Sequence, residues 1–113
     1  MTALHDLSAV ELLARYRERS LSPVEVTRAV LDRIARLNPV LNAVVTPVFD
    51  RALEEARRVP QGPFAGVPYL LKDLACEMEG VRFTEGSRFL ADHVSAFDSE
   101  LVLRLRRAGL VIL

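Results

Sequence analysis

The sequence predicts an α/β fold. Three observations support this prediction: apolar residues recur at helical spacing after two capping motifs, two short apolar segments have the character of buried strands, and helical patterns separate these segments. The expected order is two helices, then strand, helix and strand, a long loop, and a last helix and strand. At 113 residues, half of them hydrophobic, the chain could form one small domain or part of a larger one.

Two helices open the chain, and each begins with the same arrangement of residues. The segments 7–11 (Leu-Ser-Ala-Val-Glu) and 21–25 (Leu-Ser-Pro-Val-Glu) both place a serine three residues before a glutamate, which is the signature of a capping box. Pro23 suits the first position of the second helix. Asn38-Pro39 is expected to end that helix, because the residue before a proline disfavours the helical conformation.

A strand, a helix and a second strand are expected next. Residues 42–46 are short, apolar and β-branched, and a helix should begin at Thr46-Pro47 and end before Pro60. A turn-rich connection, 61–66, then leads into an apolar segment that ends at Lys72. This order indicates a crossover unit of strand, helix and strand, although it leaves open whether the two strands pair in parallel.

The last third of the chain is expected to contain a long loop, a helix and a strand. Periodicity is lost over 75–96, which follows the carboxyl end of a strand, where open α/β sheets place their sites. Asp98 is expected to cap a helix, with Phe97 packed on Val102, Leu101 and Leu105 facing inward, and Gly109 as its left-handed stop. Residues 110–113 (Leu-Val-Ile-Leu) are typical of a strand buried on both faces. Because the chain stops inside this strand, we expect it to be the amino-terminal piece of a longer protein.

Composition excludes several classes of protein. Fifteen basic and fifteen acidic residues cancel, which argues against direct binding to nucleic acid or to an anionic membrane surface. No apolar run reaches the length of a membrane span. Cys76 is the single cysteine, so a disulfide framework is excluded, and no Cys or His pair has metal-ligand spacing. We expect no cofactor, no metal and a cytoplasmic location.

Lys72 needs an explanation, because it is the only lysine beside fourteen arginines. One interpretation is a neutral amine acting as a general base, which burial in an apolar pocket favours since a buried ammonium is costly. The other is a lysine at a strand end that reaches water along its stem. Residue types and spacing alone do not decide between them. Asp73 should face the opposite side of the strand and serve as a turn or backbone hydrogen-bond residue.

The remaining polar residues are expected to have structural roles. Cys76 is interpreted as a small apolar filler, because no neighbouring cation in the sequence would activate its thiol. His5 and His93 are interpreted as surface residues. Residues 84–87 (Thr-Glu-Gly-Ser) could line a pocket or form a tight turn. The arginines of 104–107 are expected to keep the outer face of the last helix solvated.

These motifs, in this order, resemble the amino-terminal part of the amidase signature family. The resemblance rests on Gly-Val-Pro-Tyr-Leu-Leu-Lys-Asp at 66–73, Thr-Glu-Gly-Ser at 84–87, Asp-Ser at 98–99 and Ala-Gly at 108–109. The two capped helices also fit, so the likeness covers nearly the whole chain. It implies that residues 1–113 form the amino-terminal portion of a single larger amidase domain, whose mixed central sheet is flanked by helices.

The resemblance also implies a reaction. Family members hydrolyse carboxylic amides, or release ammonia from glutamine as part of an amidotransferase, with a serine nucleophile, a second serine in a cis peptide and a lysine. Lys72 would be that lysine, the general base for the bridging serine. Ser87 and Ser99 do not match the family's serine motifs, so both family serines are absent from this chain. We therefore expect the 113 residues alone to be inactive.

Two alternatives to a small-molecule amidase stay open. The chain could belong to one subunit of an amidotransferase, which would act with partner subunits on a tRNA substrate. It could instead be a helical interaction module if the protein truly ends at Leu113. The partners expected for the amidase are a small-molecule amide and the remainder of its own polypeptide, and a homodimer stays open.

Overall fold

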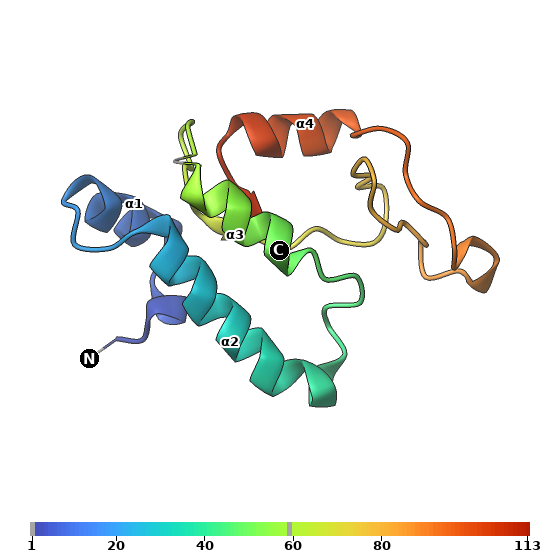
Figure 1. The fold of residues 1–113 in the computed structure, drawn as a ribbon, viewed down its shortest axis with the longest axis horizontal. Coiled ribbons are helices and arrows are strands. Elements are labelled where there is room, and N and C mark those ends of the chain that lie inside the picture. Colours follow the sequence, from blue (N-terminus) through green and yellow to red (C-terminus); the bar gives the residue numbers. More distant parts are fainter. Residues whose placement is uncertain (1, 59) are drawn as a thin grey trace.

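The computed structural model describes residues 2–58 and 60–113, and these residues form helices around one short strand pair (Figure 1). The α/β prediction is confirmed. The elements, in chain order, are the 3-10 helix η1 (Leu4–Asp6), α1 (Ala9–Arg17), α2 (Pro23–Leu41), α3 (Phe49–Arg57), β1 (Pro68–Tyr69), the 3-10 helix η2 (Arg88–Leu90), α4 (Glu100–Arg107) and β2 (Val111–Ile112). None of these helices combines the length and the apolar composition needed to cross a membrane.

Both predicted capping boxes are present. The Glu11 N–H donates to Ser8 Oγ at 3.3 Å, and the Ser8 N–H donates to the Glu11 carboxylate at 2.8 Å. Ser22 and Glu25 repeat the same pair of bonds at the start of α2, with Pro23 in the first turn. Each box satisfies donors that a helix leaves unpaired at its amino end.

The predicted end of α2 at Asn38-Pro39 is wrong. The helix continues through Pro39 to Leu41 and ends at Asn42, which has a left-handed conformation (φ 48°) and donates its N–H to the Asn38 carbonyl at 2.7 Å. Proline removes only one helical donor, and the carbonyl that loses it belongs to the exposed Ala35, which water can reach.

The strand predicted over 42–46 is also wrong, and side chains explain why. The amide of Asn38 takes both backbone groups of Val44: its Oδ1 accepts the N–H at 2.8 Å and its Nδ2 donates to the carbonyl at 2.9 Å. Arg82 donates to the Val45 carbonyl at 3.2 Å. These bonds replace the ladder that a neighbouring strand would provide, so the predicted crossover unit that begins at this segment does not form.

The parallel pair in the described residues joins β1 to β2 instead. Pro68 lies opposite Val111 and Tyr69 opposite Ile112. The Val111 N–H donates to the Val67 carbonyl at 2.9 Å, and the Leu113 N–H donates to the Tyr69 carbonyl at 3.0 Å. The connection between the strands runs through the long segment that projects away from the helices in Figure 1 and returns through α4. A crossover between parallel strands is therefore present, but it joins β1 to β2 through α4 and not the segment 42–46 to β1 through α3.

Residues 62–66 dock against the end of α4, and this docking aligns the two strands. The Phe64 N–H donates to the Ala108 carbonyl at 2.7 Å, and the Gly66 N–H donates to the Gly109 carbonyl at 2.9 Å. Gly109 has the predicted left-handed conformation (φ 88°). A Cβ on Gly66 would lie 2.5 Å from Pro23 Cγ, so the first turn of α2 approaches this turn too closely for any side chain.

Strand β2 is buried on both faces, as its apolar run predicted. Val111 and Leu113 pack with Ala52 and Ala56 of α3, beneath the apolar face of α2. Ile112 points the other way, into a second cluster with Met78 and Val102. Successive residues of one strand thus join two cores, which is the pattern of an inner strand.

The start of α4 differs from the prediction by one residue. Ser99, not Asp98, is the cap, and its Oγ accepts the Val102 N–H. Val102 is the buried residue of the helix, whereas Leu101 and Phe97 are 49% and 55% exposed, so their predicted inward contacts are wrong. Asp98 instead accepts the Glu79 N–H at 2.8 Å and ties the preceding loop to the helix.

Replacing Gly66 with Ala should destabilise the fold by about 2–4 kcal/mol, because the new Cβ combines a positive φ of 83° with overlap on Pro23. Gly86→Ala is the matched control, since Gly86 also has a positive φ (69°) but no atom within 4 Å of the new Cβ. It should cost only the conformational part, about 1–2 kcal/mol. Denaturant unfolding measures both, and equal losses would contradict the close packing at Gly66.

Candidate functional site

A cleft of about 230 Å³ opens beyond the carboxyl ends of β1 and β2. Its floor is apolar and comes from both strand ends and from the second core cluster. Its polar side chains are one amine, one carboxylate, one thiol, one guanidinium and one hydroxyl. They belong to Lys72, Asp73, Cys76, Arg82 and Thr46. This is the edge of a parallel sheet at which open α/β domains place their ligands.

Lys72 lines this cleft but is exposed, so the apolar burial considered for it is not found. The described residues match the other interpretation, a lysine that reaches water. The cause is the shortness of β1, which ends three residues before Lys72. Tyr69 and Leu70, which lead to it, are themselves 40% and 50% exposed. No ion pair between residues of the described ranges includes Lys72.

Asp73 is a hydrogen-bond residue, as predicted. Its Oδ1 accepts the Thr84 backbone N–H at 2.8 Å, and its Oδ2 accepts the Thr84 hydroxyl. Burial by itself would raise the pKa of Asp73, but the bonds from Thr84 and the Glu85 N–H, with the charge of Arg82, lower the pKa below its ordinary value. Asp73 does not face away from Lys72, because the strand has ended and both residues line the cleft.

Residues 84–87 form a tight turn beside the cleft, which decides between the two interpretations of this segment. Glu85 and Gly86 have positive φ values of 52° and 69°, and the Ser87 N–H donates to the Thr84 carbonyl at 2.9 Å. The Thr84 hydroxyl also accepts the Gly86 N–H at 3.2 Å. Thr84 therefore links the turn to Asp73, eleven residues earlier, a contact that no local sequence signal indicated.

Arg82 is a residue of the cleft that the sequence did not single out. Its guanidinium donates to the Val45 carbonyl at 3.2 Å and to Thr46 Oγ1 at 3.4 Å. It thereby joins the loop after α2 to the loop after β1, and both loops contribute residues to the cleft lining. Its role depends on a contact over 36 residues of sequence, which periodicity cannot reveal.

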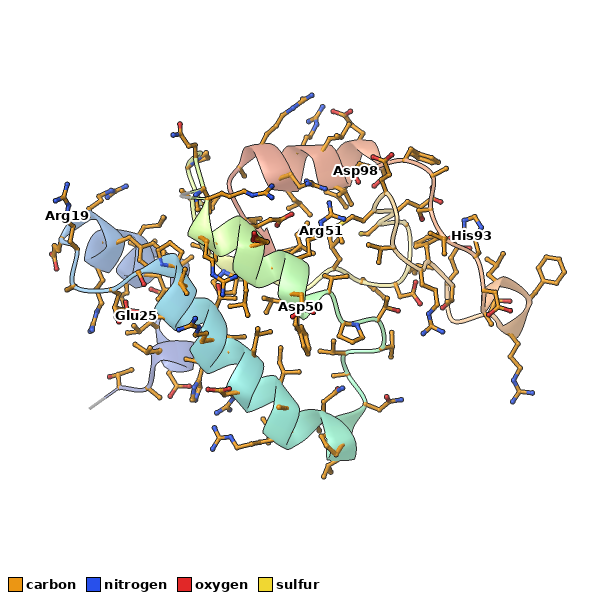
Figure 2. All side chains as sticks on the ribbon, viewed as in Figure 1. Arg19, Glu25, Asp50, Arg51, His93 and Asp98 are labelled. Atoms are coloured by element: carbon orange, nitrogen blue, oxygen red, sulfur yellow. The ribbon has the colours of Figure 1, made fainter. Side chains whose placement is uncertain are left out.

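Three other residues considered from the sequence are Cys76, which lines the apolar floor of the cleft, and His5 and His93, which do not line it. Cys76 packs against the second core cluster, in agreement with its predicted role as a filler. His93 lies on the projecting segment, where Figure 2 labels it, and its Nε2 is 3.7 Å from the Glu77 carboxylate. His5 is not a surface residue as predicted: its side chain is 20% exposed and contacts Arg33.

The arginines of α4 are not all on its outer face, which corrects the prediction for 104–107. Arg106 pairs with Asp98 at 3.2 Å and with Glu55 of α3 at 3.5 Å, so it joins the two helices. Figure 2 shows Asp98 at the start of α4 and Arg51 on the neighbouring α3. Arg104 remains exposed and pairs with Glu100 within the helix. Over the described ranges, no group of three His, Cys, Asp or Glu side chains could hold a metal ion.

A parallel strand pair with a polar cleft beyond its carboxyl ends is the arrangement in which open α/β domains bind their ligands. Residues 25–113 match the model of the Amidase family, and the chain belongs to this family. The resemblance of the sequence to the amidase signature enzymes is thereby confirmed.

Curated relatives are components of a tRNA amidotransferase. The chain is 40% identical to the A subunit of the glutamyl-tRNA(Gln) amidotransferase of Alkalilimnicola ehrlichii, in an alignment that covers 97% of this chain and 24% of the relative. It is 42% identical to the corresponding protein of Moorella thermoacetica, with the same coverage. The chain thus spans about a quarter of the length of these relatives.

Solved structures with the same fold include a hydrolase and an amidase. A 6-aminohexanoate cyclic dimer hydrolase matches all of the chain and 23% of its own length, with a TM-score of 0.89 and 32% identity. The peptide amidase of Stenotrophomonas maltophilia matches 96% of the chain and 24% of its own length, with a TM-score of 0.85 and 33% identity. The amino-terminal α/β architecture predicted from the sequence therefore agrees with the fold of this family.

Asp73→Asn should lower the free energy of unfolding by about 1.5–3 kcal/mol at neutral pH, the usual worth of hydrogen bonds to a charged group. A lowered pKa in the folded state means that this stabilisation is present above the ordinary value of 3.8 and is lost as the pH falls through the lowered pKa. The difference between wild type and variant should therefore shrink in acid, as measured by denaturant unfolding at several pH values. Asp92→Asn, at an exposed loop position, is the control and should change little. A constant difference across the acid range would contradict the role of the Asp73 charge.

Proposed function

We propose that residues 1–113 are the amino-terminal part of a larger amidase domain, which hydrolyses the carbon–nitrogen bond of a small carboxylic amide. Lys72 is its general base. The observation that carries this proposal is that the single lysine of a chain from the Amidase family lines the cleft at the sheet edge. Solved relatives with the same fold include a 6-aminohexanoate cyclic dimer hydrolase and a peptide amidase, and both are about four times as long as this chain.

In this mechanism the remainder of the polypeptide supplies two serines. The Lys72 amine takes a proton from a bridging serine, which takes one from the nucleophilic serine as it attacks the amide carbonyl. The proton returns through the relay to the leaving nitrogen, so that ammonia or an amine departs and an acyl-enzyme remains. Water then attacks the acyl-enzyme by the same relay. Lys72 is exposed in the described residues and so is accessible to hydroxyl groups from outside them.

The same site also supports a second candidate, an amidotransferase component that releases ammonia from glutamine. The observation in its favour is sequence identity: 40–42% to the tRNA amidotransferase proteins, against 32–33% to the two amide hydrolases. In this role the protein would act with partner subunits and a tRNA substrate. A cytoplasmic location is part of both proposals, and a homodimer stays a prediction.

Lys72→Ala and Lys72→Arg in the complete protein should each lower kcat for amide hydrolysis by about 10²–10⁴-fold, the usual contribution of a general base. Arginine keeps the positive charge and the length but cannot give up its proton at working pH, so it should not rescue the reaction. Release of ammonia or amine measures turnover, and thermal unfolding checks that both variants are folded. Arg107→Ala, an exposed cation far along α4, is the control. Near-normal turnover by either lysine variant would remove Lys72 from the mechanism.

The two candidate functions differ in what the purified complete protein does alone. An amidase should hydrolyse a simple amide, such as an anilide, without partner subunits. An amidotransferase component should instead release ammonia from glutamine, with a rate that rises when its partner subunits and the aminoacylated tRNA are added. Steady-state assays with both substrates, with and without the added components, decide between them. Full activity on simple amides in isolation would exclude the amidotransferase role.

A further inference from the structure

The carboxylate of Asp73 is committed to hydrogen bonds within its own loop. Both oxygens accept from Thr84, one from its N–H and the other from its hydroxyl. Thr84 is only 8% exposed, so water competes little for these bonds. Its hydroxyl is further fixed by the Gly86 N–H, which orients the oxygen lone pair and so directs the hydroxyl proton to Asp73. The Asp73 carboxylate, the Thr84 N–H, the Thr84 hydroxyl and the Gly86 N–H thus form one connected hydrogen-bond network.

This arrangement matters for Lys72 because the two residues are adjacent and line the same cleft. A carboxylate near an ammonium favours the protonated amine, which is the form that cannot act as a base. An acid next to a catalytic lysine would therefore be harmful if its oxygens were free to turn toward the amine. In the structure they are not free, and Lys72 forms no ion pair with any residue of 2–58 or 60–113.

The other charged and titratable groups that line this cleft are Arg82 and Cys76. Arg82 carries a positive charge, which attracts the Asp73 carboxylate and helps to lower its pKa. Its position is fixed by the Val45 carbonyl and Thr46. Cys76 is packed against the apolar cluster beneath the cleft. Asp73 is therefore the one acid, among the described residues that line the cleft, whose release could hold the amine protonated.

We propose that Thr84 is a positioning residue for the amidase reaction: by binding both oxygens of Asp73, it keeps this carboxylate away from Lys72 and leaves the amine free to accept a proton. The inference rests on the proposed function of Lys72 and adds a reason for the buried hydroxyl in the turn 84–87. A structural residue alone would need only a side chain that fills the same volume.

The test compares Thr84→Val with Thr84→Ser in the complete protein. Valine keeps the shape and the backbone N–H but removes the hydroxyl, so Asp73 Oδ2 loses its bond to the Thr84 side chain. The acidic limb of the pH profile of kcat/KM, measured by amine release from an anilide substrate, should then move to higher pH by about 0.2–0.7 unit, the size expected for a partly exposed ion pair. Serine restores the hydroxyl and should restore the position of the limb.

A double variant makes the result specific to the charge. When Asp73→Asn is combined with Thr84→Val, no carboxylate is left to release, so the shift caused by valine should vanish. An unchanged acidic limb in Thr84→Val would overturn the inference, as would a shift that persists in the double variant. If Thr84→Val does not fold, Asp73→Asn alone decides: an acidic limb that stays in place supports a carboxylate held away from Lys72, and a limb that moves to lower pH overturns the inference.

Failure of this inference is distinguishable from failure of the proposed function. If Lys72→Ala and Lys72→Arg keep their activity, the proposed function fails whatever the Thr84 variants show. If both lysine variants are inactive and the Thr84→Val limb stays in place, Lys72 remains the base and Thr84 is only a structural residue.

Discussion

The close approach of two backbones, at residues 62–66 and at the end of α4, is the constraint on which the rest of the structure depends. Two backbone hydrogen bonds, from Phe64 to Ala108 and from Gly66 to Gly109, fix the register in which β1 pairs with β2. The approach requires glycine on both sides, because a Cβ on Gly62 or Gly109 would lie 2.5 Å from the opposite backbone. The parallel register, the burial of β2 on both faces and the position of the cleft all follow from this contact.

Beyond the strands, side chains rather than regular structure hold the long loops in place. Asn38 satisfies the backbone of Val44, Arg82 joins the loop after α2 to the loop after β1, and Asp73 binds the turn at Thr84. Each of these bonds links a polar side chain to a backbone group that has no partner in a helix or a ladder. These side chain-to-backbone hydrogen bonds therefore hold the loops that line the cleft. The same bonds fix the positions of the charged groups of Asp73 and Arg82.

The parts of the fold that could be predicted from the sequence are those set by neighbouring residues. Capping boxes at Ser8 and Ser22, the glycine stop at Gly109 and the buried strand after it depend on spacings of a few residues, and the structure agrees with them. The failures at 42–46 depend on bonds from Asn38 and Arg82 that a linear pattern does not reveal. For the site, the presence of a single lysine in the sequence was enough to select Lys72. Its exposure and the hydrogen bond between Asp73 and Thr84 could be found only in the three-dimensional structure.

The scarcity of lysine has a practical consequence. A protease that cuts after lysine has one recognition point within these 113 residues, the bond between Lys72 and Asp73, two residues that line the cleft. Cutting there would separate β1 from β2 along the chain while their ladder and the contact of Gly66 with Gly109 still join the two pieces. A nicked molecule of this kind would reveal whether strand pairing survives without the covalent path between the strands.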